Sequence, residues 1–228
     1  MWSFVNSLGL PQNGTGDAIG AISGSAAVDY LNQRLIFASR RNGGGSPNTV
    51  WCIEFSSGDP VLVWAVDIGD VDTSPVRAGG VVYVGTVAGE VYALDAMDGS
   101  TKWARPLSDF AVKSFVFPQF GSNNLIVSTN SRVWSLADNG TSGDVNLNWP
   151  VTTITAPSAP LFVPGTSEVI VGSGDGMLYQ LDVFAPSPAG VTLGDGAGVG
   201  SPTMDVVNSM LYVGSATGVI YGVSFPLF

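Results

Sequence analysis

A repeat of about 42 residues is the feature of this sequence that most restricts its possible folds. Each of five repeats reads as a short apolar strand, a tight turn and a second strand that carries an aromatic residue. The aromatics are 41, 42, 45 and 42 residues apart, and they are Trp51, Tyr92, Trp134, Tyr179 and Tyr221. The turns contain Gly, Asn or Asp, which are typical of β-hairpins. Five hairpins in phase predict a repeat architecture.

Two further strands complete each repeat. A short strand, usually introduced by Ser and Pro, is expected before each hairpin, within 24–29, 74–79, 114–118, 159–164 and 201–207. A strand is also expected after the hairpin, at 61–68, 101–107 and 147–152, each with a tryptophan, and at 190–195. Each repeat is then a four-stranded antiparallel meander, with strands A, B, C and D in chain order. Such repeats predict an all-β propeller whose blades are these meanders.

The fifth repeat lacks room for a D strand, because only seven residues follow Tyr221. Residues 2–8 match the D-strand pattern and stand before the first A strand. We predict that Trp2–Ser7 pairs with the strand near Val219–Ser224 and closes a five-bladed ring, which would leave no unpaired strand edge. The blades of this single domain are then 21–69, 70–109, 110–153, 154–196 and 197–228, with the strand at 2–8 completing the last. The alternative is a piece of a propeller with seven or eight blades.

The charges restrict the partners of the chain. Eight basic and 18 acidic residues give a net charge of −10. Nucleic-acid binding needs a basic stripe, which the sequence lacks, and an anionic membrane surface disfavours an acidic protein. No run of 18 apolar residues is present, so we expect no insertion into a membrane. A protein partner is favoured, in particular a basic one.

The absence of histidine and the single cysteine restrict the chemistry. Without histidine the chain cannot build a Ser-His-Asp triad, a Cys-His pair, or a zinc or haem site with a histidine ligand. Cys52 has no second cysteine for an intrachain disulfide. Its place within a strand predicts that it is a small buried apolar residue.

Residues 93–103 carry a recognisable motif, Ala-Leu-Asp-Ala-Met-Asp-Gly-Ser-Thr-Lys-Trp. It resembles the quinoprotein, or PQQ-type, repeat A-x-D-x-x-T-G-x-x-x-W, with Asp98 in place of the threonine. The resemblance implies that Gly99 forms the turn between strands C and D. It also implies that tryptophans dock neighbouring blades against each other, at Trp2, Trp64, Trp103 and Trp149.

The quinoprotein-like family includes quinone-dependent dehydrogenases and non-catalytic scaffolds of the bacterial outer-membrane assembly machinery. Many of its alcohol dehydrogenases carry two adjacent cysteines at the cofactor, whereas this chain has only Cys52. We also identify no Glu, Asn and Asp set that matches the calcium site of the catalytic members. The resemblance therefore favours the non-catalytic branch, with no cofactor.

One end of a propeller carries both the D–A connections and the B–C turns, and loops on a rigid scaffold often bind ligands. Most of these connections contain aspartate here. The predicted ligand- or partner-binding face comprises Asp17, Asp70, Asp72, Asp109, Asp175 and Asp195, with Arg40 and Arg41 on the long first B–C turn. The alternative is that these are solvated turn residues, because Asp favours turns. Ca²⁺ could bind the aspartates of 67–72 or those of 138–144, although neither has a known calcium spacing.

The favoured function is a non-catalytic binding or scaffolding module of a secreted or cell-envelope protein assembly. The acidic, lysine-poor surface rich in Gly, Ser and Thr favours an extracytoplasmic location, which is the periplasm, the cell surface or the medium. One alternative is a quinone-dependent oxidoreductase or a relic of one. Another is a glycan-binding or glycoside-hydrolysing propeller, for which the inner strands offer Asp29, Lys113 and Asp205, with Arg77.

Overall fold

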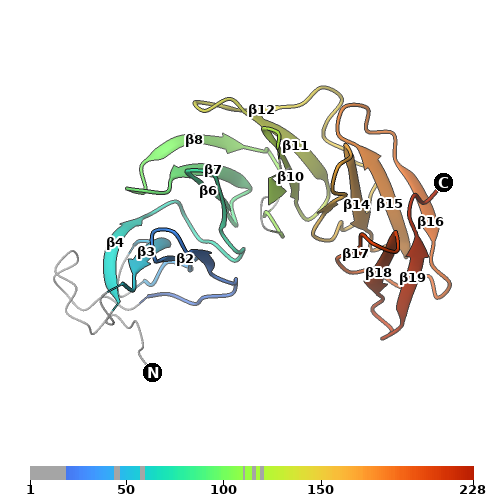
Figure 1. Ribbon diagram of the computed structural model, residues 1–228, viewed down its shortest axis with the longest axis horizontal. Coiled ribbons are helices and arrows are strands. Elements are labelled where there is room, and N and C mark those ends of the chain that lie inside the picture. The colour runs from blue at the N-terminus through green and yellow to red at the C-terminus, as the bar shows by residue number, and fades with distance from the viewer. Residues whose placement is uncertain (1–18, 44–46, 57–59, 110, 115–116, 119–120) are drawn as a thin grey trace. The chain divides into compact units, whose positions relative to one another are not determined.

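The structure is a computed structural model that describes residues 19–228, apart from 44–46, 57–59, 110, 115–116 and 119–120. Its regular elements are all strands, and they form five antiparallel sheets (Figure 1). Four of these sheets have four strands in chain order, and the fifth has three. The chain divides into two compact units, an N-terminal unit of residues 1–115 and a C-terminal unit of residues 116–228.

The N-terminal unit contains two complete sheets. The first consists of β1 (Ala27–Asp29), β2 (Arg34–Ala38), β3 (Val50–Glu54) and β4 (Val61–Val66). The second consists of β5 (Val76–Ala78), β6 (Val81–Gly85), β7 (Glu90–Asp95) and β8 (Thr101–Pro106). Both are simple meanders, so each predicted repeat of this unit forms one sheet.

The C-terminal unit contains three sheets. The third sheet consists of β9 (Phe117–Pro118), β10 (Asn124–Ser128), β11 (Val133–Asp138) and β12 (Gly143–Val145). The fourth consists of β13 (Leu161–Phe162), β14 (Glu168–Gly172), β15 (Met177–Asp182) and β16 (Ala189–Thr192). The fifth consists of β17 (Thr203–Asp205), β18 (Met210–Gly214) and β19 (Ile220–Ser224).

The predicted phase of the repeat is confirmed by the strand register. In each hairpin the aromatic of the C strand lies directly opposite the fourth residue of the B strand. The five pairs are Trp51 with Phe37, Tyr92 with Val84, Trp134 with Val127, Tyr179 with Val171, and Tyr221 with Val213. Because opposite residues share one face of a sheet, the repeat places the same contact at the same point of every blade.

The cores lie between consecutive sheets of a unit. One core cluster joins Ile36 and Cys52 of the first sheet to Val82 and Leu94 of the second. Similar clusters join the third sheet to the fourth and the fourth to the fifth. Middle strands such as β14 are therefore buried on both faces and read as continuous apolar runs. Cys52 is buried in the first cluster, as its strand position predicts.

The D strand of the third repeat does not lie where the sequence predicts it. The prediction was 147–152, but the strand is β12, and only Val151 returns to the sheet through an isolated bridge to Val133. Between them the chain turns, with Asn148 at a φ of 67° and the Trp149 N–H donating to the Asn146 carbonyl. Pro150 has no N–H to donate to a ladder, so the tryptophan that marked the strand lies in a loop instead.

The predicted closing strand, residues 2–8 with Trp2, lies outside the described residues. Ring closure and the blade boundaries therefore stay predictions. Within the described part of the chain, there is no helix with the length and apolar character needed to cross a membrane.

Candidate functional site

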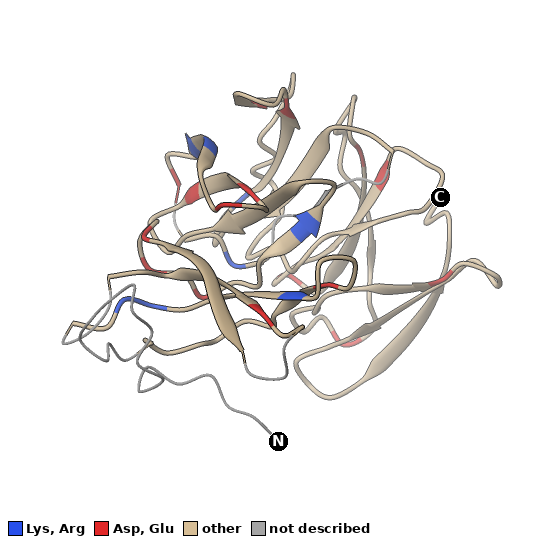
Figure 2. Ribbon diagram, turned by 60° about the vertical axis from the view of Figure 1, so that its left-hand side comes forward, with Lys and Arg blue, Asp and Glu red and all other residues tan. Residues whose placement is uncertain are grey.

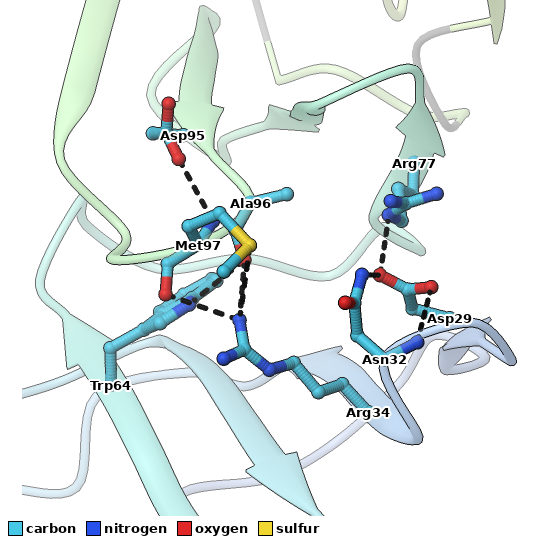
Figure 3. A network of polar contacts seen from close by, with 8 residues as sticks. All are labelled: Asp29, Asn32, Arg34, Trp64, Arg77, Asp95, Ala96 and Met97. Carbon is cyan, nitrogen blue, oxygen red and sulfur yellow. Dashed lines mark hydrogen bonds and ion pairs between the residues drawn. The ribbon is translucent and has the colours of Figure 1, made fainter.

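The first and second sheets are held together by a network of polar contacts around a tryptophan (Figure 3). The indole N–H of Trp64 on β4 donates to the Ala96 carbonyl at 3.3 Å. Its ring lies so close to Gly99 that a Cβ added there would be 2.7 Å from the indole. Arg34 on β2 donates to the carbonyls of Ala96 and Met97 at 3.3 and 3.2 Å. Arg34 and Trp64 of the first sheet therefore both donate hydrogen bonds to the turn between β7 and β8.

A buried ion pair joins the inner strands of the same two sheets. The Arg77 guanidinium on β5 lies 3.0 Å from the Asp29 carboxylate on β1, whose side chain is only 4% exposed. Asn32 donates to the same carboxylate through its backbone N–H and its amide. Burial acts to raise the pKa of Asp29, but the Asn32 hydrogen bonds and the Arg77 charge outweigh it and lower that pKa below its ordinary value.

The C-terminal unit repeats the tryptophan contact. The indole N–H of Trp149 donates to the Val183 carbonyl at 2.8 Å, and its ring belongs to the core cluster between the third and fourth sheets. Trp103 is buried, with its ring centroid 6.2 Å from that of Tyr83. Trp2 lies outside the described residues. Two of the four predicted docking tryptophans therefore make equivalent hydrogen bonds to the next sheet.

Serines at the start of the A strands, which the sequence shows as markers of those strands, make a second repeated link. The Ser25 N–H donates to Ser74 Oγ at 2.8 Å, from the first repeat to the second. The Ala159 N–H donates to Ser201 Oγ at 3.2 Å, from the fourth repeat to the fifth. In the later four repeats a serine stands 18 to 21 residues before the aromatic, and this regular placement was the available signal for the link.

The structure brings together part of the predicted binding face. Arg40 pairs with Asp72, and Arg41 pairs with Asp67 at 2.8 Å. The Arg41 N–H also donates to Asp70. The Arg40 hydrogen bond lowers the pKa of Asp72 below its ordinary value. These charges join the long first B–C turn to the following D–A connection, so they first of all hold two loops in place.

The predicted aspartates of the C-terminal unit are also bound by neighbouring groups. Asp195 accepts hydrogen bonds from the hydroxyls of Ser215 and Thr217, which lower its pKa to about 2. Asp175 accepts the Tyr179 hydroxyl at 3.0 Å. Acidic residues are spread over many turns of the molecule (Figure 2). Asp109 is half-buried in the loop after β8, and Asp17 lies outside the described residues.

A hollow of about 440 Å³ opens beside Asp195 in the C-terminal unit. Its walls come from the β14–β15 turn, the connection before β17 and the β18–β19 turn, and they are Gly174, Gly198, Val199, Gly200, Gly214, Ser215 and Ala216. These walls carry mostly backbone and few functional side chains. Ser215 is the one lining residue with a polar side chain, and its hydroxyl donates to Asp195.

The candidate metal residues form turn contacts. Asp144 accepts hydrogen bonds from Asn139 and Ser142, and Asp138 accepts the Gly140 N–H. In the described part of the chain, no three Cys, Asp or Glu side chains gather in a group that could hold a metal ion. Burial raises the pKa of the Cys52 thiol to about 11, which makes it a poor nucleophile near neutral pH.

The residues considered for glycoside hydrolysis have other contacts. Asp29 is paired with Arg77, and a lowered pKa does not suit a general acid. Asp205 accepts hydrogen bonds from the N–H and amide of Asn208. Lys113 is exposed in the connection after β8. Asp29 and Asp205 lie in different units, each at the end of an A strand.

Exposed apolar side chains stand on several turns outside the predicted binding face. Asp29 and Asn32 tie the first A–B turn and leave Tyr30 and Leu31 at its tip, with Leu31 91% exposed. The same D-x-x-N pattern ties the fifth A–B turn, where Val207 is 92% exposed. Further exposed apolar residues on C–D turns are Met97 and Phe184. The available signal was a D-x-x-N turn enclosing two apolar residues.

Comparison with solved structures defines the class of fold. The chain resembles the crystal structure of BamB from Moraxella catarrhalis, with a TM-score of 0.67 and 22% identity over 88% of this chain and 57% of that one. It also resembles the computationally designed Ika8 protein, with a TM-score of 0.64 and 13% identity over 86% of this chain and 57% of that one. Together with the four-stranded meanders, these likenesses define a β-propeller fold.

The sequence comparisons define the family. The family model described as outer membrane protein assembly factor BamB, of the PQQ-repeat type, matches residues 6–105 and 58–185. Assembly factor BamB of Salmonella typhimurium is 32% identical over 116 residues, which are 51% of this chain and 28% of the relative. That of Legionella pneumophila is 30% identical over 154 residues, 66% of this chain and 37% of the relative. The chain belongs to this BamB family, which confirms the quinoprotein-like resemblance, and it spans little more than a third of these relatives at most.

Proposed function

We propose that this chain is a non-catalytic module that holds protein partners in an assembly at the cell envelope. The supporting observation is a set of apolar residues displayed on turns that internal hydrogen bonds fix, above all Tyr30 and Leu31. A rigid turn loses little conformational entropy on binding, and aromatic and large apolar side chains commonly anchor protein interfaces. Membership of the BamB family supports the same function, because the relatives are named as outer membrane protein assembly factors.

The turn that displays Tyr30 and Leu31 is followed closely by a basic residue, Arg34. Arg34 uses one guanidinium nitrogen for the carbonyls of Ala96 and Met97, beside the exposed Met97 side chain. We call Tyr30, Leu31 and Met97 the apolar tips of this unit.

The second proposed surface is the face predicted from the sequence. It comprises Arg40 and Arg41 with Asp70, Asp72 and Asp109 in the N-terminal unit, Asp175 and Asp195 in the C-terminal unit, and Asp17, which lies outside the described residues. Most of these charges are engaged internally, so the surface would present fixed turns rather than free carboxylates. Such turns suit a protein partner better than a metal ion, and we propose no cofactor.

We also propose that the propeller is a five-bladed ring, closed by pairing of Trp2–Ser7 with β19. Among the described residues the fifth sheet has three strands, with β19 at one edge. A fourth strand there would satisfy the free edge. An extracytoplasmic location completes the proposal, in keeping with the names of the relatives.

Site-specific photo-crosslinking in an envelope preparation tests the function. The photoreactive residue is placed at Leu31 on the apolar tips, at Gly43 on the long B–C turn, and at Val61 as an exposed strand control. We expect one discrete adduct from position 31 that disappears in a Tyr30→Ser background, and none from position 61. Equal labelling at all three positions would contradict a specific surface.

A redox assay separates this proposal from the quinone-dependent alternative. The protein is mixed with the quinone, Ca²⁺, an alcohol or sugar and a reducible dye. We expect no dye reduction above that of the Asp29→Asn variant or of buffer. Turnover that depends on the protein would overturn the non-catalytic function.

A further inference from the structure

The hollow of about 440 Å³ in the C-terminal unit is lined by glycines that the fold itself does not require. Gly198, Gly200 and Gly214 belong to its walls, and none of the three has a φ in the left-handed region. Among the described residues, the nearest atom to a Cβ added at Gly214 would be the Val219 carbonyl oxygen, at 4.0 Å. A Cβ at Gly200 would likewise meet no described atom closer than 3.4 Å. Side chains at these positions would fit the protein but would take up the space of the hollow.

Two other glycines of the same region show the contrast, because close packing does require them. A Cβ added at Gly172 would lie 2.2 Å from the Gly200 carbonyl oxygen. One added at Gly176 would lie 2.6 Å from the carbonyl carbon of Gly196. These close approaches hold the β14–β15 hairpin against the connection before β17, so they build the walls of the hollow. The glycines that line it serve a different purpose, which is to leave it open.

Asp195 places a negative charge next to this space. Ser215 lines the hollow, and its hydroxyl donates to Asp195 Oδ2 at 2.6 Å. The Thr217 hydroxyl and the Ala197 N–H donate to the same carboxylate. The two hydroxyl hydrogen bonds favour the charged form and lower the pKa of Asp195 to about 2, so the carboxylate is ionised at neutral pH.

This charge meets no basic side chain within the described part of the C-terminal unit. Residues 116–228 contain seven of the 18 acidic residues of the chain but only one of its eight basic residues, Arg132. The four ion pairs among the described residues all lie in the N-terminal unit. There, two arginines of the first B–C turn pair with aspartates of the D–A connection that follows. The D–A connection that carries Asp195 has hydroxyl partners instead, which leave its charge uncompensated.

We infer that the hollow receives an arginine side chain of a protein partner, whose guanidinium lies beside Ser215 in the field of Asp195. The mostly apolar walls suit the methylene stem of an arginine. Its guanidinium is more weakly hydrated than the ammonium group of lysine, so it leaves water more readily for a site with few polar groups. Complementary charge would also favour the encounter of a basic partner with this acidic unit. The inference rests on the proposed protein-binding function and names the chemistry of one partner group.

Binding of a short peptide to the full chain is the first test. The probe is the blocked peptide Gly-Gly-Arg-Gly-Gly, and its control carries citrulline, which has nearly the same shape but no charge. The amide signals of Gly200, Ser215 and Ala216 report occupation of the hollow in a nitrogen-edited spectrum. We expect saturable shifts of these signals with the arginine peptide and about three- to fivefold weaker binding of the citrulline peptide. The difference should shrink as salt is added, because salt screens exposed charges.

Two results of this titration would overturn the inference. Equal affinities of the arginine and citrulline peptides would show that the hollow does not recognise a cation. Shifts that leave the signals of Gly200, Ser215 and Ala216 unchanged would show that the arginine binds elsewhere.

Removing the charge is the second test. Asp195→Asn keeps the shape of the side chain, and we expect it to weaken the arginine peptide about three- to fivefold while leaving the citrulline peptide unchanged. Asp205→Asn is the matched control, because it removes one exposed charge from the same unit, in a turn that Asp205 closes with Asn208. The control should bind the arginine peptide as the parent chain does. Equal losses in the two variants would mean that only the total charge matters, which would contradict a specific site.

Filling the hollow is the third test. Gly214→Val places a branched side chain at the end of β18, where a Cβ has open space around it. We expect this variant to keep the unfolding midpoint of the parent chain and to weaken both peptides at least about tenfold. Undiminished binding of the arginine peptide would overturn the hollow as its site. If the variant did not fold, the comparison of Asp195→Asn with Asp205→Asn would still decide the inference.

Failure of this inference and failure of the proposed function can be told apart. The crosslinking test of the function uses Leu31 in the N-terminal unit, whereas the peptide test uses the hollow of the C-terminal unit. A discrete adduct from position 31 without peptide binding at the hollow would end the inference and leave the function standing. Absence of that adduct would count against the function whatever the peptide does.

Discussion

The two units use the same apolar contact between sheets but differ in the polar groups around it. All four ion pairs among the described residues lie in the N-terminal unit, and they are Arg40–Asp72, Arg41–Asp67, Arg77–Asp29 and Lys102–Asp95. Seven of the eight basic residues of the sequence precede residue 116. The C-terminal unit uses hydroxyl groups instead, as in the contacts of Ser215 and Thr217 with Asp195.

The comparison shows which contacts are common to both units and which polar contacts vary between them. Both units keep a tryptophan that donates to a carbonyl of the next sheet and an aliphatic pair on the receiving face. The ion pairs of the N-terminal unit and the hydroxyl contacts of Asp195 in the C-terminal unit both link loops and turns. The apolar contact should therefore dominate stability in both units, while salt and acid should affect them differently.

Removing the docking tryptophan should have the largest effect. Trp64→Ala and Trp149→Ala each take a buried indole out of a core cluster, which costs about 3–5 kcal/mol of unfolding free energy. Hydrogen exchange measured by mass spectrometry should show faster exchange in the first and second sheets for Trp64→Ala. For Trp149→Ala the faster exchange should lie in the third and fourth sheets.

The conservative variants Trp64→Phe and Trp149→Phe serve as controls. They keep an aromatic ring and lose the indole N–H, so each should lose only about 1 kcal/mol for the hydrogen bond, plus a small packing term. If either alanine variant exchanged like the parent chain, the two units would not share one docking contact.

Breaking the buried ion pair should come second, and only in the N-terminal unit. Asp29→Asn leaves Arg77 beside a neutral amide, and Arg77 is partly screened because its side chain is 25% exposed. We therefore expect a loss of about 2 kcal/mol, below the ~3–5 kcal/mol for a fully buried pair. Denaturant unfolding measures this loss, and added Arg77→Met should recover part of it. A double variant as unstable as the two losses summed would argue against direct pairing.

Much of this arrangement follows from the sequence, because the apolar repeat sets it. The aromatic positions gave the register of all five hairpins, since a period-2 strand has only two faces to choose from. The third D strand could not be placed, because its tryptophan lies in a loop between Asn146 and Pro150 and still reaches Val183. The tryptophan of a repeat therefore indicates the contact with the next sheet, but not the position of the D strand.

The polar site was less predictable from sequence for a related reason. The aspartates of the predicted face were visible, but their partners, such as Arg40 for Asp72, are 32 residues away in the chain. Which carboxylate is engaged depends on loops that the repeat does not fix. The apolar tips were not predicted, because Asp29 was considered only as a carboxylate of the glycoside-hydrolase alternative, whereas it closes a turn with Asn32.

Removing the serine links should have a smaller effect, similar in the two units. Ser74→Ala deletes the acceptor of the Ser25 N–H, and Ser201→Ala deletes the acceptor of the Ala159 N–H. Each exposed link should contribute about 0.5–1 kcal/mol. Amide exchange of Ser25 and Ala159 measures each link separately. Ser187→Ala, in a loop before β16, is a control that should leave the exchange of both amides unchanged. If Ser187→Ala speeded the exchange of Ser25 or Ala159 as much as the link variants do, the effect would not come from loss of the links.

Replacing Asp195 should have the smallest effect at neutral pH and should be seen chiefly in acid, in the C-terminal unit alone. Its pKa is lowered from 3.8 to about 2 in the folded chain by the Ser215 and Thr217 hydroxyls. A lowered folded-state pKa contributes stability that is present above pH 4 and is lost as the pH falls towards 2. Asp195→Asn should therefore loosen the β18–β19 turn slightly at pH 7 and flatten its response between pH 4 and 2. Amide exchange of Ser215 and Val219, followed against pH, measures this.

Asp205→Asn is the control, because its turn lies at the other end of the β17–β18 hairpin. If amide exchange in the β18–β19 turn still changed between pH 4 and 2 in the Asp195→Asn variant, other carboxylates would be responsible for that change. The hydroxyl network would then not be the C-terminal unit's counterpart of the ion pairs.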